Sequence, residues 1–372
     1  MRAVLTTIAW IIGVIGVTAE EQPRDLSKEL NDLRTEAKVP ALAAAAISSD
    51  GLKAAGAFGQ RSRNERKVVT VNDKFHLGSC TKSMTATLTA ILIEEGLLDW
   101  DTTIGEVLGK RIRKCHEDYK AVTVEQLLAH VGGLAKTPPP AAWTQAWEEQ
   151  GRKKPPTQRL NFLKAVLSEA PSYPPGTKTE YSNQGYAIVG AMLETLAKKS
   201  WEALLQDRIF NPLGMKSAGF RDPSHPRRLD HPWGHDAEGN AMPPHPSKDN
   251  PDAIGPGATV HANITDWAKF AQFHLRRKPG KLLKQGISFD KLNSLLPTSG
   301  QHGIGGWLVL DREDLGGHCI QMNGSNTMWY ATMWIVPGRD LAVVVATNTG
   351  EQHAFGTCDK VVGKLIREFG QE

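Results

Sequence analysis

The pattern of apolar and polar residues predicts strands near both ends of the chain and helices between them. Segments typical of strands lie at 41–47, 52–58, 68–71, 305–310, 319–322, 329–335 and 341–347. Segments with helical spacing lie at 26–37, 124–130, 158–170, 184–197, 264–275 and 360–369. We therefore expect one antiparallel sheet in which strands from the two ends of the chain meet.

The segment from Ser79 to Glu95 is predicted to be a buried helix. Met84, Leu88 and Ile91 lie on one face of such a helix, and alanines occupy much of the remainder. A helix that is apolar nearly all round is buried on every side. The whole pattern predicts an α+β fold, with an antiparallel sheet flanked by helices (about 25–78 and 300–372) and an inserted all-helical lobe (about 79–299).

Residues 1–19 have the pattern of a secretory signal peptide. Arg2 is followed by an apolar run from Ala3 to Val17, and small residues end the segment at Ala19. We expect cleavage after Ala19, which leaves a mature domain of residues 20–372 that is secreted or periplasmic and not stably inserted in a membrane. The apolar run is shorter than the roughly 20 residues that span a bilayer, and an uncleaved anchor is the alternative.

Composition narrows the functional classes. With 44 basic and 40 acidic residues, the chain carries a formal net charge of only +4, so no nucleic-acid partner is expected. The 4 cysteines are too few and too dispersed for a disulfide scaffold or a CxxC metal site, although a Cys319–Cys358 bridge is one option. Histidines within 222–252 are separated by proline and glycine. We expect neither a metal nor a cofactor.

The start of the predicted buried helix pairs a candidate nucleophile with a candidate base. Ser79 and Lys82 are three residues apart and would share one helical face. A serine hydroxyl becomes a good nucleophile when a base removes its proton, and burial can lower the pKa of a lysine enough for it to do so. The same spacing recurs at Ser288 and Lys291, but no apolar helix follows that pair.

A second motif strengthens this interpretation. Tyr181-Ser182-Asn183 is the only YxN sequence in the chain, and an apolar helix follows it. Tyr181 would assist proton transfer with Lys82, and the amide of Asn183 would hold a carbonyl or amide of the substrate. Alone, Tyr181 would be interpreted as a half-buried aromatic residue at a helix entry. His130 is interpreted as a structural residue at a helix end.

These motifs resemble the serine β-lactamase and penicillin-binding-protein superfamily, above all class C β-lactamases, serine esterases and D-alanyl-D-alanine carboxypeptidases. The stretches 209–215 (IFNPLGM) and 346–348 (ATN) support the resemblance. It implies an acyl-enzyme at Ser79 in a cleft between the lobes, with an oxyanion hole formed by the backbone N–H groups of Ser79 and Ser325. It also implies a strand motif of Lys or His, a polar residue and Gly. The best match is Met322-Asn323-Gly324.

Met322 departs from that motif, because a thioether carries no charge and donates no hydrogen bond. The expected substrate-binding residues are Asn183, Met322, Asn323, Gly324 and Ser325. We expect a secreted serine hydrolase that acts through an acyl-enzyme on a small-molecule or peptide ester or amide, in order of preference an esterase, a carboxypeptidase or a β-lactamase. The alternative is a catalytically weak or inactive binding protein that keeps the pocket of the same fold.

Overall fold

The computed structural model describes residues 22–371, and the predicted signal peptide lies outside this range. Within it, the main sheet has the strand order β1-β3-β2-β12-β11-β10-β9. Neighbouring strands are antiparallel, except that β1 and β3 are parallel. The strands are β1 (Arg24–Asp25), β2 (Ala41–Ile47), β3 (Leu52–Gly59), β9 (Leu308–Arg312), β10 (Gly317–Ser325), β11 (Tyr330–Val336) and β12 (Leu341–Thr347).

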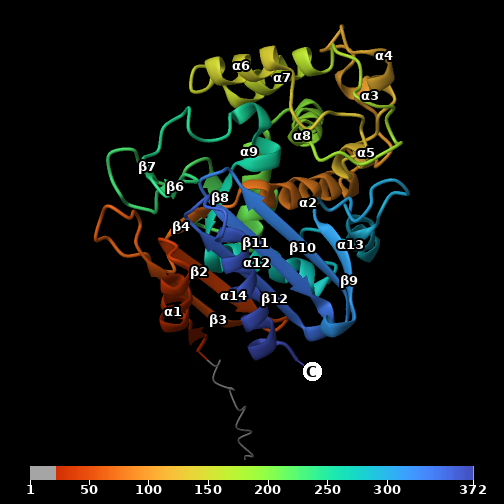
Figure 1. Ribbon diagram of the computed structural model, residues 1–372. Helices are drawn as coiled ribbons and strands as arrows, with labels where there is room; N and C mark the ends of the chain where they lie inside the picture. Colours follow the sequence, from red (N-terminus) through yellow and green to blue (C-terminus); the bar gives the residue numbers. More distant parts are fainter. Residues whose placement is uncertain (1–21, 372) are drawn as a thin grey trace, which may run out of the picture.

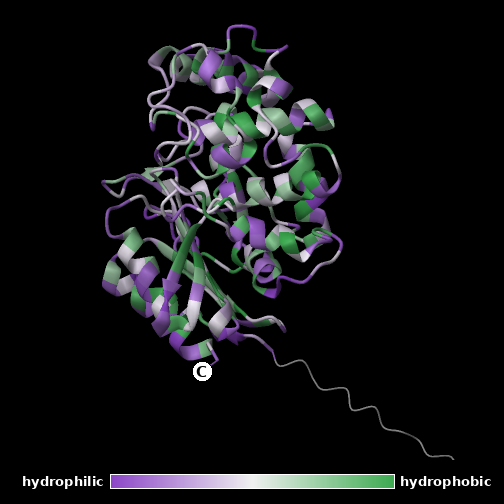
Figure 2. Cartoon of the chain, turned by 90° about the vertical axis from the view of Figure 1, so that its right-hand side faces the viewer, coloured by the Kyte–Doolittle hydropathy of each residue, from purple (hydrophilic) through white to green (hydrophobic). Residues whose placement is uncertain are grey.

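The two ends of the chain meet in the middle of this sheet, as the sequence predicts. Ala43 of β2 pairs with Ala346 of β12, and every residue of both strands is buried. Helices cover both faces. One face packs against α1 (Ser27–Ala37) and α14 (Ala354–Phe369), and the other packs against α12 (Ile264–Arg276). In Figure 2 the central strands are mostly hydrophobic, consistent with burial on both sides. The predicted α+β fold is confirmed.

The segment between the N-terminal and C-terminal strands is mainly helical, and Figure 1 shows many of its helices gathered above the sheet. Besides α12, the helices of this segment are α2 (Thr81–Glu94), α3 (Ile104–Leu108), α4 (Glu117–Lys120), α5 (Val124–Leu128), α6 (Pro140–Glu149), α7 (Pro155–Val166), α8 (Asn183–Ala197), α9 (Trp201–Leu205), α10 (Asn211–Leu213), α11 (Gly255–Ala258) and α13 (Gly286–Asn293). No helix within 22–371 is long and apolar enough to cross a membrane.

The inserted segment is not all-helical, which corrects that part of the expectation. It contributes β5 (Gly219–Phe220) and β8 (Val260–Asn263), which form a small sheet with β4 (Lys74–His76) in the order β4-β8-β5. It also contains the hairpin of β6 (Gly234–His235) and β7 (Ala241–Met242). In addition, α12 packs on the main sheet. Strand β8 of the inserted segment pairs with β4, the strand that leads into the turn carrying Ser79. The lobe boundaries at 79 and 299 remain a prediction.

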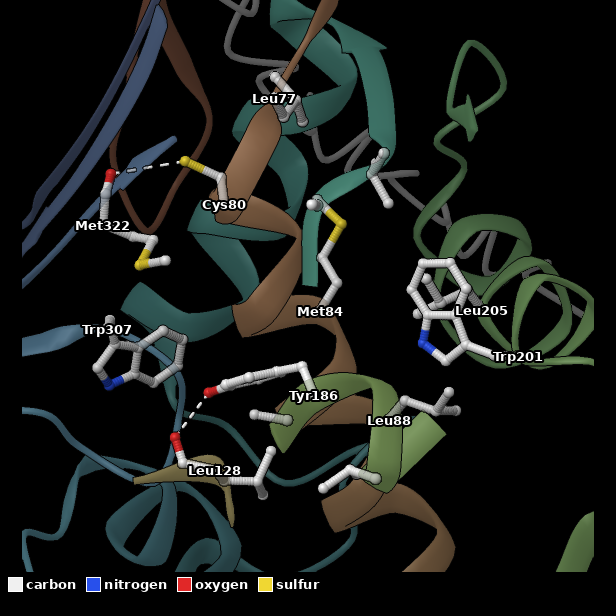
Figure 3. Close-up of a cluster of buried hydrophobic side chains, with 14 of the residues drawn as sticks. Leu77, Cys80, Met84, Leu88, Leu128, Tyr186, Trp201, Leu205, Trp307 and Met322 are labelled. Carbon is white, nitrogen blue, oxygen red and sulfur yellow. Dashed lines mark hydrogen bonds between the residues drawn. The ribbon is translucent and has the colours of Figure 1, made fainter. Parts of the chain in front are cut away.

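Helix α2 runs through the interior, as its apolar composition predicts. All residues from Thr81 to Leu92 are buried. Figure 3 shows residues of this helix and its entry, among them Leu77, Cys80, Met84 and Leu88, in the same hydrophobic cluster as Tyr186, Trp201 and Trp307. A side chain at the start of α2 is therefore removed from water.

Two local expectations are wrong, and one option is not realised. The segment 68–71 is no strand: Val68 makes one isolated bridge, and the Asp73 carboxylate accepts the N–H of Thr70 at 2.7 Å, which closes a turn instead. Strand β9 begins at Leu308 and not at 305, because Gly306 turns the chain with a φ of 78°. The bridge considered at 319 and 358 does not form, since all four cysteines are free and buried.

Candidate active site

Ser79 lies where two backbone segments approach each other closely. It occupies the 3₁₀ turn η1 (Gly78–Cys80), directly before α2, and its side chain is partly exposed. Gly78 has a φ of 50°, and a Cβ atom there would lie 2.4 Å from the backbone nitrogen of Ser325. A Cβ atom at Gly324 would lie 2.9 Å from the backbone nitrogen of Ser79. Only glycines at both positions allow η1 and β10 to come this close.

The structure brings together the three residues that the sequence predicts to be catalytic. The Tyr181 hydroxyl donates to Ser79 Oγ at 2.6 Å, and Lys82 Nζ lies 3.2 Å from the same oxygen. Lys82 Nζ also lies 4.6 Å from the centre of the Tyr181 ring. The Ser79 hydroxyl is therefore within hydrogen-bond distance of two groups that exchange protons.

The electrostatics of Lys82 are unusual for a lysine. Its side chain is completely buried, and its other two contacts are Asn183 Oδ1 at 2.6 Å and the Gly257 carbonyl at 2.8 Å. All three partners of its amine are uncharged oxygens. Burial disfavours the charged ammonium and lowers the pKa of Lys82 to about 7. Near neutral pH a large share of this amine is therefore unprotonated and can accept the serine proton.

Tyr181 and Asn183 reach the site because α8 begins between them. Ser182 caps this helix, since its Oγ accepts the N–H of Gln184 at 3.2 Å. The cap turns Tyr181 out of the helix and places Asn183 in its first turn. Burial raises the pKa of the Tyr181 phenol, so it stays protonated and acts as a donor at neutral pH.

His130 belongs to the site, which sequence reasoning did not predict. Its ring lies 4.5 Å from that of Tyr181, and its Nδ1 accepts the N–H of Ser182 at 3.2 Å. His130 has a φ of 60° and lies two residues after the end of α5. Burial and the nearby Lys82 amine lower the pKa of His130 well below its usual value, so the ring is neutral. The only sequence signal was its position before Val131-Gly132-Gly133 at a helix end.

The residues of the third motif alternate between the two faces of β10. Met322 is buried in the core cluster (Figure 3). Because side chains alternate along a strand, Met322 and Gly324 belong to the same face of the sheet. Asn323 points to the opposite face, where its Oδ1 accepts from Thr332 at 2.7 Å. Ser325 is exposed at the end of β10. The backbone of the motif at Gly324 and Ser325 is thus the part that lies close to Ser79. The substrate-binding role of the motif remains a prediction.

The second SxxK sequence makes ordinary structural contacts. Ser288 donates a hydrogen bond to Glu94, and Lys291 forms an ion pair with Glu125 at 2.7 Å. Lys291 is therefore engaged by a carboxylate and does not act as a base for Ser288. Across the described part of the chain, no group of three or more His, Cys, Asp or Glu side chains is placed to hold a metal ion.

Comparison with known families identifies the family of this chain. A family model described as Beta-lactamase matches residues 26–364, nearly the whole described chain. The chain belongs to the Beta-lactamase family. This family assignment confirms the resemblance inferred from the sequence motifs, and the chain is thereby a member of a hydrolase family with the β-lactamase fold.

Individual relatives include penicillin-binding proteins and hydrolases. The chain is 30% identical to penicillin-binding protein 4 from Amycolatopsis lactamdurans, over 87% of this chain and 85% of that protein. It is 28% identical to an unguisins hydrolase from Aspergillus campestris, over 59% of this chain and 41% of that protein. A D-stereospecific amidohydrolase from Streptomyces sp. has the same fold, with a TM-score of 0.69 and 19% identity over 92% of this chain and 97% of that one.

The close approach of η1 and β10 predicts a large effect of Gly78→Ala. Gly96→Ala is the matched control, because Gly96 also has a positive φ, of 76°, but has nothing within 4 Å of the position of a Cβ atom. Both changes strain the backbone by roughly 1 kcal/mol or more, and only the first also pushes β10 away. We expect urea unfolding to show the larger loss of stability for Gly78→Ala, which should also lose reactivity towards a fluorophosphonate. Equal effects of the two changes would contradict this packing.

The lowered pKa of Lys82 predicts the pH dependence of acylation. Because the unprotonated amine is the reactive form, the rate should rise with pH, with a midpoint at about 7, and level off above it. The measurement is the rate of fluorophosphonate labelling as a function of pH. His302→Gln is the control, since His302 also lies near Tyr181, with 6.3 Å between the ring centres. A midpoint that disappears in this variant would assign the titration to histidine and refute the role of Lys82.

Proposed function

We propose that the protein is a serine hydrolase that forms an acyl-enzyme at Ser79 and cleaves ester or amide bonds. The observation that carries the proposal is the pair of contacts on Ser79 Oγ, from a buried lysine amine and from a tyrosine hydroxyl. The names of two relatives, a hydrolase and an amidohydrolase, support the same class of reaction. We further propose that residues 1–19 direct the enzyme to the periplasm or the outside of the cell.

The geometry supports a two-step reaction. Ser79 Oγ attacks the carbonyl carbon while Lys82 Nζ takes its proton, and the N–H groups of Ser79 and Ser325 stabilise the negative charge that develops on the carbonyl oxygen. The leaving group departs with a proton relayed from Lys82 through Tyr181. Water then attacks the acyl-enzyme and gives up a proton to Lys82 by the same route. Lys82 returns this proton to Ser79 Oγ as the bond to the acyl group breaks, which releases the acid and restores Ser79.

The surroundings favour substrates without a carboxylate beside the scissile bond. Met322 stands where the family motif has Lys or His, and it is buried and uncharged. Asn183 already uses its Oδ1 to accept from Lys82, so its NH₂ group remains to donate to a substrate carbonyl. We therefore place esters and amides with neutral acyl groups before carboxylate-bearing peptides and β-lactams.

The function is tested by mapping a fluorophosphonate adduct. Ser79 should be labelled, Ser79→Ala should abolish labelling, and the matched control Ser288→Ala should leave it unchanged.

Lys82→Ala and Tyr181→Phe should each lower the acylation rate by about 100-fold or more, because each removes a proton-transfer group. Their combined effect should be smaller than the product of the two, since both act on one proton. Absence of an adduct in the folded wild type would instead support the inactive binding protein.

The substrate class is tested by Met322→Lys. A charged contact to a substrate carboxylate contributes about 1.5–3 kcal/mol, which is roughly 10- to 100-fold in rate. The wild type should prefer a short-chain nitrophenyl ester to a cephalosporin, and the lysine should raise the ratio of cephalosporin to ester kcat/KM. Met322→Leu controls for altered packing and should leave the ratio unchanged. If the wild type already prefers the cephalosporin, or if Met322→Lys leaves the ratio unchanged, either the register that places Met322 in the cleft is wrong or another residue supplies the charge.

A further inference from the structure

A buried carboxylate outside the predicted motifs connects the two segments that meet at Ser79. Asp249 lies in the Pro-rich stretch before α11 and is only 4% exposed. Its Oδ1 lies 3.1 Å from Nε2 of His76 and accepts a hydrogen bond from Nδ2 of Asn326 at 3.0 Å. Neither contact belongs to the Ser79, Lys82 and Tyr181 cluster.

The first contact leads to the segment that carries the nucleophile. His76 is buried at the end of β4, and its Nδ1 accepts the N–H of Gly78 at 3.1 Å. Because Nδ1 accepts this bond, the ring proton of the neutral imidazole resides on Nε2, which faces Asp249. Asp249 thereby fixes the orientation of the ring, and the ring holds the backbone directly before Ser79.

The second contact leads to the other segment. Asn326 follows Ser325, and its Oδ1 accepts the N–H of Met328 at 3.3 Å. The amide of Asn326 is thus held at both ends, by Asp249 and by the turn that leads into β11. This arrangement fixes the end of β10, to which the N–H of Ser325 belongs.

We propose that Asp249 is a positioning residue that sets the spacing between the backbone N–H groups of Ser79 and Ser325 through His76 and Asn326. The inference rests on the proposed acyl-enzyme function, in which these two groups form the oxyanion hole. A carboxylate suits this task because it can hold polar groups of two separate segments: it accepts a hydrogen bond from Asn326 and lies 3.1 Å from Nε2 of His76. Hydrogen bonds are strong when the acceptor is charged. Oxyanion stabilisation requires donors held in place before the reaction.

The test compares Asp249→Ala with Asp249→Asn. Alanine removes the shared acceptor, so the acylation rate should fall about 10- to 100-fold, the range expected for misplaced catalytic groups. Asparagine keeps an oxygen at the position of Oδ1 and should recover part of this loss. The pH midpoint of the labelling rate should not move, because Lys82 is untouched. In addition, the carbonyl stretch of a ¹³C-labelled acyl-enzyme should shift to higher frequency in Asp249→Ala, as expected for weaker hydrogen bonds to the carbonyl oxygen.

Two further variants separate positioning from general destabilisation. Glu194→Gln is the matched control, because Glu194 is also a buried carboxylate, paired with Arg159 away from Ser79. It should lower stability without changing the carbonyl frequency. Asn326→Ala removes one of the two contacts and tests the same inference if Asp249→Ala does not fold.

The outcomes distinguish the inference from the function on which it rests. A wild type that is not labelled at Ser79 would refute the proposed function. A labelled wild type whose acylation rate and carbonyl frequency are unchanged in Asp249→Ala, or in Asn326→Ala if only that variant folds, would refute the role of Asp249 alone. A frequency shift of the same size in Glu194→Gln would likewise refute it.

Discussion

The chemistry proposed for this protein depends on a lysine amine buried without a carboxylate partner. An ammonium group in that environment loses its hydration and gains no compensating charge, so the neutral amine is favoured. The fold creates this environment by placing Lys82 in the first turn of α2, which is surrounded by protein on all sides. A carboxylate beside Lys82 would restore the ordinary pKa and remove the base. The three uncharged oxygens around Nζ orient the amine without doing so.

A second constraint is geometric. The nucleophile lies at the junction of η1 and β10, and the junction exists only because β10 belongs to a sheet whose strands come from both ends of the chain. The pairing of β2 with β12 fixes that sheet, and β4 and β8 fix the approach to Ser79. The site therefore forms only when residues more than 200 positions apart are in place. A change that disturbs the main sheet is therefore expected to disturb the site as well.

The parts of the structure that the sequence predicts are those with a local periodic signal. The helical spacing predicted for residues 79–95 brought Ser79 and Lys82 together, although Ser79 lies in η1 and not in α2. The YxN sequence at the start of α8 located Tyr181 and Asn183. The meeting of N-terminal and C-terminal strands followed from their positions along the chain. Each of these features depends on spacing within a few residues or on the order of elements, and both are visible without coordinates.

The remainder depends on tertiary contacts that no spacing encodes. Asn323 faces away from Ser79 because Gly324 takes the inward position of β10, which the motif alone does not determine. His130 lies beside Tyr181 because His130 itself has a left-handed backbone conformation after a helix end, and Asp249 contacts two segments from a loop without periodicity.

The central claim is tested most directly by an NMR titration of ¹³Cε-labelled lysine, with the Lys82 signal identified by its loss in Lys82→Arg. We predict a pKa of about 7 for Lys82 in the folded protein. A signal that titrates at the ordinary lysine value of about 10.4 would contradict the account.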